Sequence, residues 1–163
     1  MPPFEAVDSA QFEPAFEIAL TAHRTEVDSI GAQRELPSFE NTVAAFDRSG
    51  RLLRRLEGLF YNLTSSETSP ALQAVERRLA PRLAAHRSAV SMHAPLFARL
   101  EALHREREML RLSPEQQRVL ERYHLDFVRA GARLGSVEQK RYAVIIGAAG
   151  RADQPLRAER ARR

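Results

Sequence analysis

The chain contains no cysteine among its 163 residues. This absence excludes disulfide bonds, thiolate metal ligands and a cysteine nucleophile, and it leads us to expect a cytoplasmic location. Lysine is almost absent as well, because Lys140 is the single lysine among 25 basic residues and the other 24 are arginine. We read this bias as a sign of a GC-rich genome, and it says little about function.

Long apolar runs are also missing. No run approaches the ~18 consecutive apolar residues that a membrane-spanning helix needs, so we expect no membrane association. The first residues, M-P-P-F-E-A-V-D, contain neither a basic segment nor an apolar segment of the kind found in secretory signals. Hydrophobic residues make up 44% of the chain and charged residues 28%, which is typical of a globular domain. The length is sufficient for one domain with a hydrophobic core.

The basic charge of the chain is concentrated at one end. The net charge is +4, and residues 147–163 carry five arginines against Asp153 and Glu159, a net of +3. A nucleic-acid groove would spread basic residues over a folded face. We therefore expect no nucleic-acid partner. The weaker alternative, binding through this tail, predicts salt-dependent binding that is lost when residues 147–163 are deleted.

Apolar residues recur at three- and four-residue intervals along most of the chain, which is the spacing of one face of an α-helix. No alternation typical of a strand and no glycine-rich phosphate loop is present. We predict an all-α fold of about six antiparallel helices with short loops, beginning near residues 9, 38, 70, 94, 114 and 136. The predicted apolar stripes are Phe12, Phe16, Ala19, His23, Val27, Ile30; Phe39, Val43, Phe46, Gly50, Leu53, Leu56, Phe60, Leu63; Leu72, Val75, Leu79, Leu83, His86; Leu96, Leu100, Leu103, Leu110; Leu120, Tyr123, Phe127, Ala130, Leu134; and Val137, Val144, Ile145.

A serine precedes five of these helices, where its hydroxyl can accept a hydrogen bond from a free backbone N–H group. Capping accounts for these serines without a nucleophile; they are Ser9 (or Asp8 in its place), Ser38, Ser69, Ser113 and Ser136. Gly50 lies inside the second stripe, which we attribute to close approach of another helix. Pro81 should kink the third helix or split it in two. The segment from Thr64 to Ser69 is predicted to be a polar loop.

The run from Ser38 to Glu76 reads S-F-E-N-T-V-A-A-F-D-R-S-G-R-L-L-R-R-L-E-G-L-F-Y-N-L-T-S-S-E-T-S-P-A-L-Q-A-V-E. It resembles the N-terminal region of the M3 family of zinc metallopeptidases, the group of peptidyl-dipeptidases and oligopeptidases. Blocks at residues 2–17, 94–103 and 112–134 are similar to the same family in the same order. The R-S-G-R-L-L-R-R run at 48–55 favours the peptidyl-dipeptidase branch. Residues 1–146 are therefore expected to form a helical N-terminal region of this type.

The resemblance implies a mostly helical shell around a deep channel that admits short peptides, with the N-terminal helices as one wall. It also implies a zinc ion held by the two histidines of an H-E-x-x-H motif and a downstream glutamate, with the glutamate of the motif as general base. That motif occurs nowhere in these 163 residues. We expect no catalytic residue and no metal ligand in this chain, and its substrate-binding residues stay unassigned. Zinc, short peptides and a catalytic domain packed against these helices belong to the full-length form.

The resemblance ends at about Gly147, where the apolar stripe disappears. A one-base shift in the Gly147 codon permits a reading that begins E-R-L-A-E-L, which looks like the continuation of the family. Residues 147–163 are accordingly interpreted as an arginine-rich tail outside the family pattern, and our hypothesis is that they are translated out of frame.

The histidines offer only weak metal-site patterns. His104 and Glu108 are four residues apart on a helix, but charges alternate around them, so surface ion pairs are expected. His86 and His93 are seven apart and lack a third ligand, which favours structural roles. His23 lies on an apolar stripe and is expected at the edge of the core.

Two further groups of side chains are interpreted as structural. His124 and Asp126 are two residues apart on one helix, point in different directions and should not pair. The strongest aromatic group is expected to pack together in the core; it contains Phe39, Phe46, Phe60 and Tyr61.

The sequence therefore predicts the non-catalytic N-terminal part of an M3-type zinc peptidase, inactive by itself. The alternative is a stand-alone helical module whose apolar faces bind a partner protein.

Overall fold

The computed structural model describes residues 9–66, 69–135, 137–139 and 141, and every regular element within these residues is helical. The elements are η2 (Ser9–Gln11), α1 (Phe12–Gly31), the π-helical turn η3 (Phe39–Ala44), α2 (Ala45–Arg48), α3 (Arg51–Ser66), α4 (Pro70–Ser91), α5 (Ala94–Glu106) and α6 (Pro114–Arg129). The predicted all-α class is confirmed. The helix predicted from Ser136 falls mostly outside the described residues, and the tail at 147–163 lies wholly outside them.

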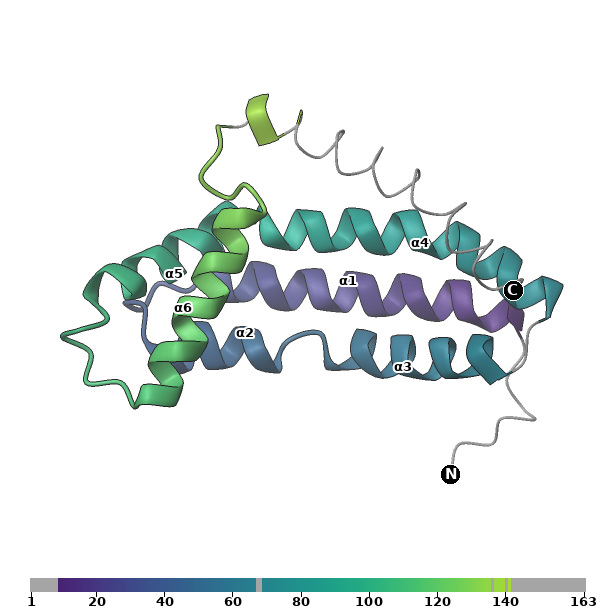
Figure 1. Cartoon of the computed structure of the whole chain (residues 1–163), viewed down its shortest axis with the longest axis horizontal. Coiled ribbons are helices and arrows are strands. Elements are labelled where there is room, and N and C mark those ends of the chain that lie inside the picture. Colours follow the sequence, from purple (N-terminus) through teal and green to yellow (C-terminus); the bar gives the residue numbers. More distant parts are fainter. Residues whose placement is uncertain (1–8, 67–68, 136, 140, 142–163) are drawn as a thin grey trace, which may run out of the picture.

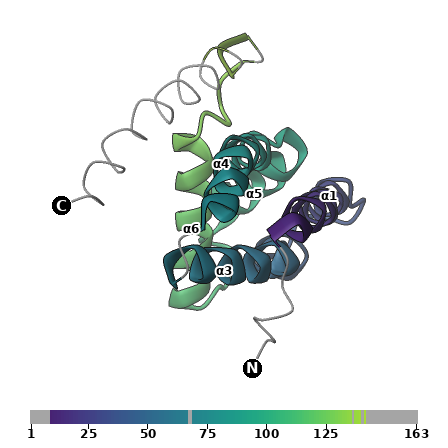
Figure 2. The ribbon, with the colours of Figure 1, turned by 90° about the vertical axis from the view of Figure 1, so that its right-hand side faces the viewer.

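Helices α1, α3 and α4 run side by side, and α5 and α6 lie across one end of them (Figure 1). The chain passes along α1, returns through α2 and α3 and then runs forward again, so α4 is parallel to α1. Figure 2 shows these three helices nearly end-on, at the corners of a triangle. Each of the described helices is too short or too polar to cross a lipid bilayer.

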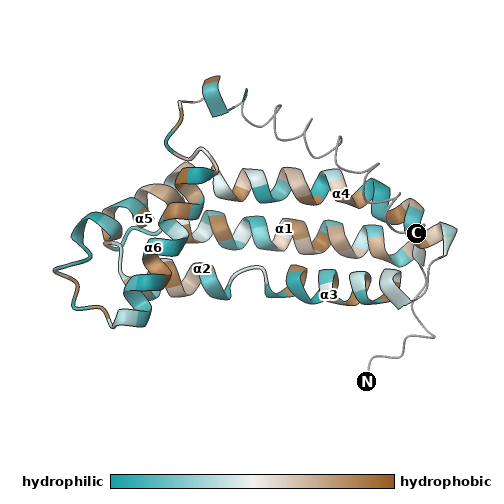
Figure 3. Ribbon diagram, viewed as in Figure 1, coloured by the Kyte–Doolittle hydropathy of each residue, from teal (hydrophilic) through white to brown (hydrophobic). Residues whose placement is uncertain are grey.

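The apolar faces form two clusters, which follow the brown bands in Figure 3. The α3 cluster contains the buried residues Phe12, Phe16, Ala19, Leu53, Phe60, Leu72, Val75, Leu79 and Leu83. The α5–α6 cluster contains the buried residues Val27, Ile30, Val43, Val90, Leu96, Phe97, Leu100, Leu103, Leu120 and Phe127. Helices α1 and α4 contribute to both clusters and so join the two halves of the molecule. Three- and four-residue spacing produced these faces, as the sequence predicted.

Three of the predicted serine caps are present. The hydroxyls of Ser38, Ser69 and Ser113 each accept a hydrogen bond from the backbone N–H three residues further on, at distances of 3.1, 3.1 and 3.2 Å. Ser38 and Ser113 belong to reciprocal capping boxes, which satisfy two free N–H groups each. The predicted cap at Ser9 is wrong, because the turn η2 comes first and the residue before α1 is Gln11, whose side chain makes no capping bond. Asp8 and Ser136 lie outside the described residues.

Gly50 interrupts the second predicted helix, so the expectation of one continuous helix is wrong. Ser49 has an extended backbone with ψ of 159°, and Gly50 has a φ of +67°. Such a positive φ is unfavourable for residues with a Cβ atom. The expected close approach is nevertheless present, since a Cβ on Gly50 would lie 3.0 Å from the ring of His23 on α1.

Other boundaries also differ from the predictions. Helix α4 continues through Pro81, so of the two predicted outcomes, a kink or a split, the split is excluded. Residues Thr64 to Ser66 belong to α3 instead of a loop, and their hydroxyls bond to carbonyl groups three or four residues earlier. Leu110 lies beyond the end of α5, and Leu134 lies beyond the end of α6. Helix α6 is followed by Gly131, which has a φ of +91°.

A buried arginine fixes the segment between α1 and η3. Arg99 on α5 is 7% exposed, and its side chain donates five hydrogen bonds in all. The acceptors are the carbonyl oxygens of Gln33 and Glu35, the side-chain oxygens of Gln33 and Asn41, and the hydroxyl of Thr42, at distances of 2.8 to 3.4 Å. Because every N–H of the guanidinium has an acceptor, the charge is solvated by neutral oxygens.

Candidate functional site

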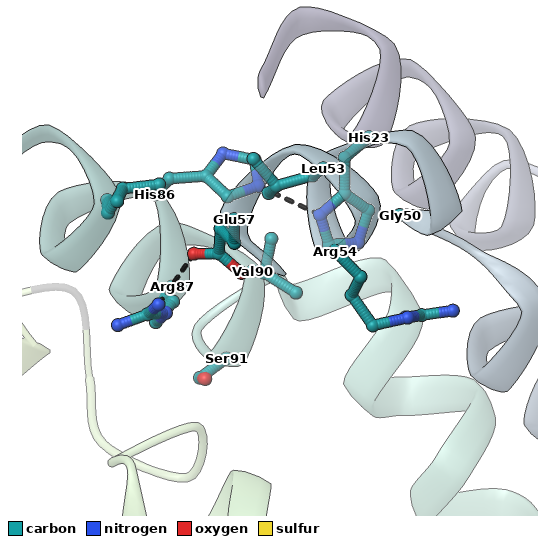
Figure 4. A pocket seen from close by; sticks show the side chains of 10 residues that line it. His23, Gly50, Leu53, Arg54, Glu57, His86, Arg87, Val90 and Ser91 are labelled. Carbon is teal, nitrogen blue, oxygen red and sulfur yellow. Dashed lines mark hydrogen bonds and ion pairs between the residues drawn. The ribbon is translucent and has the colours of Figure 1, made fainter. Parts of the chain in front are cut away.

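A cleft of about 190 Å³ lies between α3 and α4, beside α1. Figure 4 shows side chains from all three helices converging on it. Its walls are mostly apolar, and its polar groups are two imidazoles and a few side chains at the rim. The lining residues are His23, Gly50, Leu53, Arg54, Glu57, Leu83, His86, Arg87, Val90 and Ser91.

The two imidazoles form a hydrogen-bonded chain with a serine. Nε2 of His86 lies 2.9 Å from Nδ1 of His23, and Nε2 of His23 lies 3.3 Å from the hydroxyl oxygen of Ser49. Ser49 donates its own hydrogen to the carbonyl oxygen of Phe46 at 2.6 Å. Ser49 must therefore accept from His23, which places the His23 proton on Nε2 and leaves Nδ1 to accept from His86.

This direction of hydrogen bonding excludes a serine nucleophile in the state observed. A catalytic base would accept the hydroxyl proton of Ser49, whereas His23 donates to that oxygen. The chain ends at Nδ1 of His86, which carries a lone pair in this tautomer. The arrangement is a polar link between helices within an otherwise apolar wall.

Charged side chains surround this link. Glu57 on α3 accepts a hydrogen bond from Arg87 on α4 at 2.6 Å. Arg54 donates to the carbonyl oxygen of Ser49 at 2.6 Å. Glu26 on α1 accepts from the backbone N–H of Gly50 at 2.6 Å and so caps the start of α3. The charged groups that line the cleft itself are two arginines and one glutamate.

Burial lowers the pKa of both imidazoles below their ordinary value of 6.5. Desolvation is the largest cause for each, since it penalises the charged form. For His86 the neighbouring His23 lowers the pKa further, while the carboxylates of Glu26 and Glu57 oppose the shift of His23. Both rings are therefore neutral at pH 7.

A second pair of histidines lies in the other half of the molecule. The rings of His104 on α5 and His124 on α6 stack with centroids 3.7 Å apart. Nε2 of His124 lies 2.7 Å from a carboxylate oxygen of Glu101, which also accepts from Arg133 at 3.1 Å. The hydrogen bond from His124 is the main cause that lowers the pKa of Glu101. Burial lowers the pKa of His104.

The two residue pairs considered as metal ligands, His104 with Glu108 and His86 with His93, make no contact with each other that would form a metal site. His86 and His93 have separate partners, because His93 caps α5 through the N–H of Leu96 and contacts Asp28 at 3.0 Å. Both histidines therefore make contacts within the fold. Glu108 lies 3.8 Å from Arg107, an exposed ion pair of the expected kind, whereas the stacking of His104 was not predicted.

Two further predictions are resolved in the same way. His124 and Asp126 do not pair, as expected, because Asp126 accepts from Arg122 at 3.0 Å. The prediction of a single aromatic group in the core is wrong. Phe39 and Phe46 pack on the α5–α6 cluster, whereas Phe60 belongs to the α3 cluster and Tyr61 is exposed. Among the described residues no group of three or more histidine, aspartate or glutamate side chains is arranged to hold a metal ion.

The contact between His23 and His86 was not foreseen from the sequence. A signal for it exists, since each histidine continues an apolar stripe, on α1 and on α4 respectively. Two polar residues on two buried faces require partners, and each is the simplest partner for the other.

No family model matches the chain. Two curated proteins do match it: the dipeptidyl carboxypeptidases of Escherichia coli K12 and of Salmonella typhimurium LT2, each 31% identical over 144 residues. Each alignment covers 88% of this chain and 21% of the relative, so the chain spans about a fifth of the length of these proteins. The chain thus belongs to the M3 peptidase family and corresponds to the N-terminal part of a dipeptidyl carboxypeptidase.

Proposed function

We propose that this chain supplies a non-catalytic helical part of a zinc-dependent peptidase that cleaves short peptides. The observation that carries the proposal is 31% identity over 144 residues to two dipeptidyl carboxypeptidases. The lack of an H-E-x-x-H motif in the 163 residues supports a non-catalytic role. The zinc ion, the general base and most of the peptide-binding groups would then belong to the other four fifths of such a protein.

The internal contacts fit a structural role. Polar side chains at the cleft and around Arg99 are used to join helices, which favours a rigid wall over a site that performs chemistry. The natural partner of this wall is the catalytic portion of the peptidase, and short peptides are its substrates. A cytoplasmic location remains a prediction and is compatible with a chain that lacks cysteine.

An exchange experiment tests the proposal. The segment of the Escherichia coli dipeptidyl carboxypeptidase that aligns with this chain is replaced by the corresponding 144 residues, and zinc-dependent release of dipeptides from a short peptide is measured. We expect activity in the chimera and none in the purified 163-residue chain. A control chimera with Arg99→Met tests whether activity depends on the folded helices. Zinc-dependent cleavage by the 163-residue chain alone would contradict the proposal, as would a folded but inactive chimera.

A stand-alone interaction module is the second candidate. Several large apolar side chains are exposed, among them Ile18 at 65%, Met109 at 75% and Leu36 at 87%. Exposed apolar groups of this kind can contact another protein. Sedimentation and thermal unfolding of the 163-residue chain separate the candidates. A monomer that unfolds cooperatively favours a stand-alone module, whereas association at low concentration favours a wall separated from its partner.

A further inference from the structure

Four side-chain contacts lie in a row along α1 and join it to α4 and to His93, the N-cap residue of α5. Their order along both helices is the same, as expected for helices that run parallel. Three contacts combine a basic with an acidic group, and one combines two imidazoles. In chain order they are Glu13–Arg78, Glu17–Arg82, His23–His86 and Asp28–His93.

We propose that the His23–His86 contact is a proton-operated latch between α1 and α4, closed while the pair holds at most one extra proton and open once it holds two. The basis is geometric. The two ring nitrogens are 2.9 Å apart, so two imidazolium rings in this position would place N–H against N–H with no acceptor between them. The contact lies at the cleft, which gives the rings space into which they can separate.

The protonation steps follow from the hydrogen-bonded chain. In the neutral pair, His86 donates from Nε2 to Nδ1 of His23, and His23 donates from Nε2 to Ser49. A first extra proton binds at Nδ1 of His86, the free end of the chain, and leaves every hydrogen bond in place. A second proton must bind at Nδ1 of His23. It removes the acceptor of the hydrogen bond between the rings, and the two positively charged rings then repel each other.

Charged side chains on α1, α3 and α4 surround the two rings. Arg24 on α1, Arg54 on α3 and Arg87 on α4 oppose a positive charge on the rings, while Glu26 on α1 and Glu57 on α3 favour one. Both carboxylates already accept hydrogen bonds, from Gly50 and from Arg87 respectively. The carboxylates therefore screen the pair but do not bridge it, and burial lowers the pKa of both rings.

The opening is expected to be local. Acid leaves the arginine–glutamate contacts of the row intact over the range in which histidine titrates. Only the His23–His86 contact changes from attractive to repulsive. Helices α1 and α4 therefore stay together at the other contacts while the cleft beside the two rings widens. This inference rests on the contacts of the described residues and is independent of the proposed peptidase role.

Nuclear magnetic resonance of the imidazole nitrogens of the full chain tests the latch directly. At pH 8 we expect both rings as Nε2–H tautomers, with a measurable coupling between Nε2 of His86 and Nδ1 of His23 across the hydrogen bond. As the pH falls below 6.5, the coupling should vanish when the second ring becomes charged, with a matching step in the amide signals of Ser49 and Gly50. Absence of the coupling at pH 8, or titration of both rings at or above pH 6.5, would overturn the proposal.

Two variants separate the latch from a general effect of acid. In His86→Gln, the amide N–H can still donate to His23 but adds no second charge, so the step at Ser49 and Gly50 should disappear. In His104→Gln, which alters the other histidine pair, the step should persist. A step that survives in His86→Gln, or one that is lost in His104→Gln, contradicts a latch made by these two rings. Global unfolding of the unaltered chain by pH 5 would also contradict it.

Discussion

The two hydrophobic clusters each border a histidine pair, but they compensate their polar groups differently. In the α5–α6 cluster, His124 is paired with the carboxylate of Glu101, and the buried Arg99 is surrounded by oxygens. Beside the α3 cluster, His23 and His86 have only each other and Ser49. One half therefore gives its imidazole a carboxylate as hydrogen-bond partner, whereas the other half joins two imidazoles to each other. Similar side chains in one small protein thus have partners of different charge.

Removing the oxygen-solvated charge from the α5–α6 half should produce the largest effect. In Arg99→Met, five hydrogen bonds are lost and the carbonyls of Gln33 and Glu35 lose their donor. We expect a loss of about 3 kcal/mol or more in the free energy of unfolding, measured by urea denaturation. Arg133→Met is the control, because its ion pair with Glu101 is exposed and should contribute less than about 1 kcal/mol. Equal effects for the two variants would show that burial of Arg99 is unimportant.

The corresponding test in the α3 half is Gly50→Ala. The backbone at this position has a positive φ, which is unfavourable for alanine, and the added Cβ would lie 3.0 Å from the ring of His23. We therefore expect a loss of about 2 kcal/mol in the free energy of unfolding. Gly58→Ala in the same helix is a matched control, since no atom lies within 4 Å of its added Cβ. That variant should gain about 0.5–1 kcal/mol. A stable Gly50→Ala protein would mean that the break between α2 and α3 is not fixed.

Glu101→Gln removes the carboxylate that compensates the second histidine pair. At pH 7 we expect a loss of about 1 kcal/mol, because the hydrogen bond from His124 loses its charged acceptor. The pKa of Glu101 is lowered in the folded state, so its contribution is present above the ordinary value of 4.5 and is lost as the pH falls below that value towards the folded-state pKa. Stability of the variant should therefore fall less steeply than that of the original chain in this acidic range.

The smallest expected effect is a change in pH dependence at His86→Gln. The pKa values of His23 and His86 are lowered by folding, so the unfolded chain binds protons first as the pH falls below about 6.5. Stability should decline from there until the folded rings themselves become charged. In His86→Gln this decline should be shallower, with little change at pH 8, as measured by urea denaturation at a series of pH values. An unchanged profile would remove the contrast between the two halves.

The sequence predicted the helices better than the contacts between them. Periodicity identified the helices, and the capping serines Ser38 and Ser113 identified two starts to within a residue, because capping depends on local neighbours. Gly50 was misjudged because it adopts a positive φ that the period cannot reveal. For Pro81 the sequence left a kink and a split open, and the helix is not split.

The polar site was predictable only in part. That His23 and His86 lie on apolar stripes is visible in the sequence, but their contact depends on α4 being parallel to α1. The same holds for Arg99, whose acceptors are 57 to 66 residues away. Family resemblance, by contrast, was visible without any structure, because it depends on the order of residues alone.

The cap that Glu26 provides to Gly50 has a consequence for how the chain folds. The first turn of α3 contains no acidic residue of its own, so the helix start is completed by a side chain 24 residues earlier on α1. An isolated peptide of α3 would lack this group and should be a poor helix in water. Formation of α3 thus depends on its contact with α1, which is distant in sequence. We therefore expect α1 and α3 to form together, in a single kinetic phase of folding.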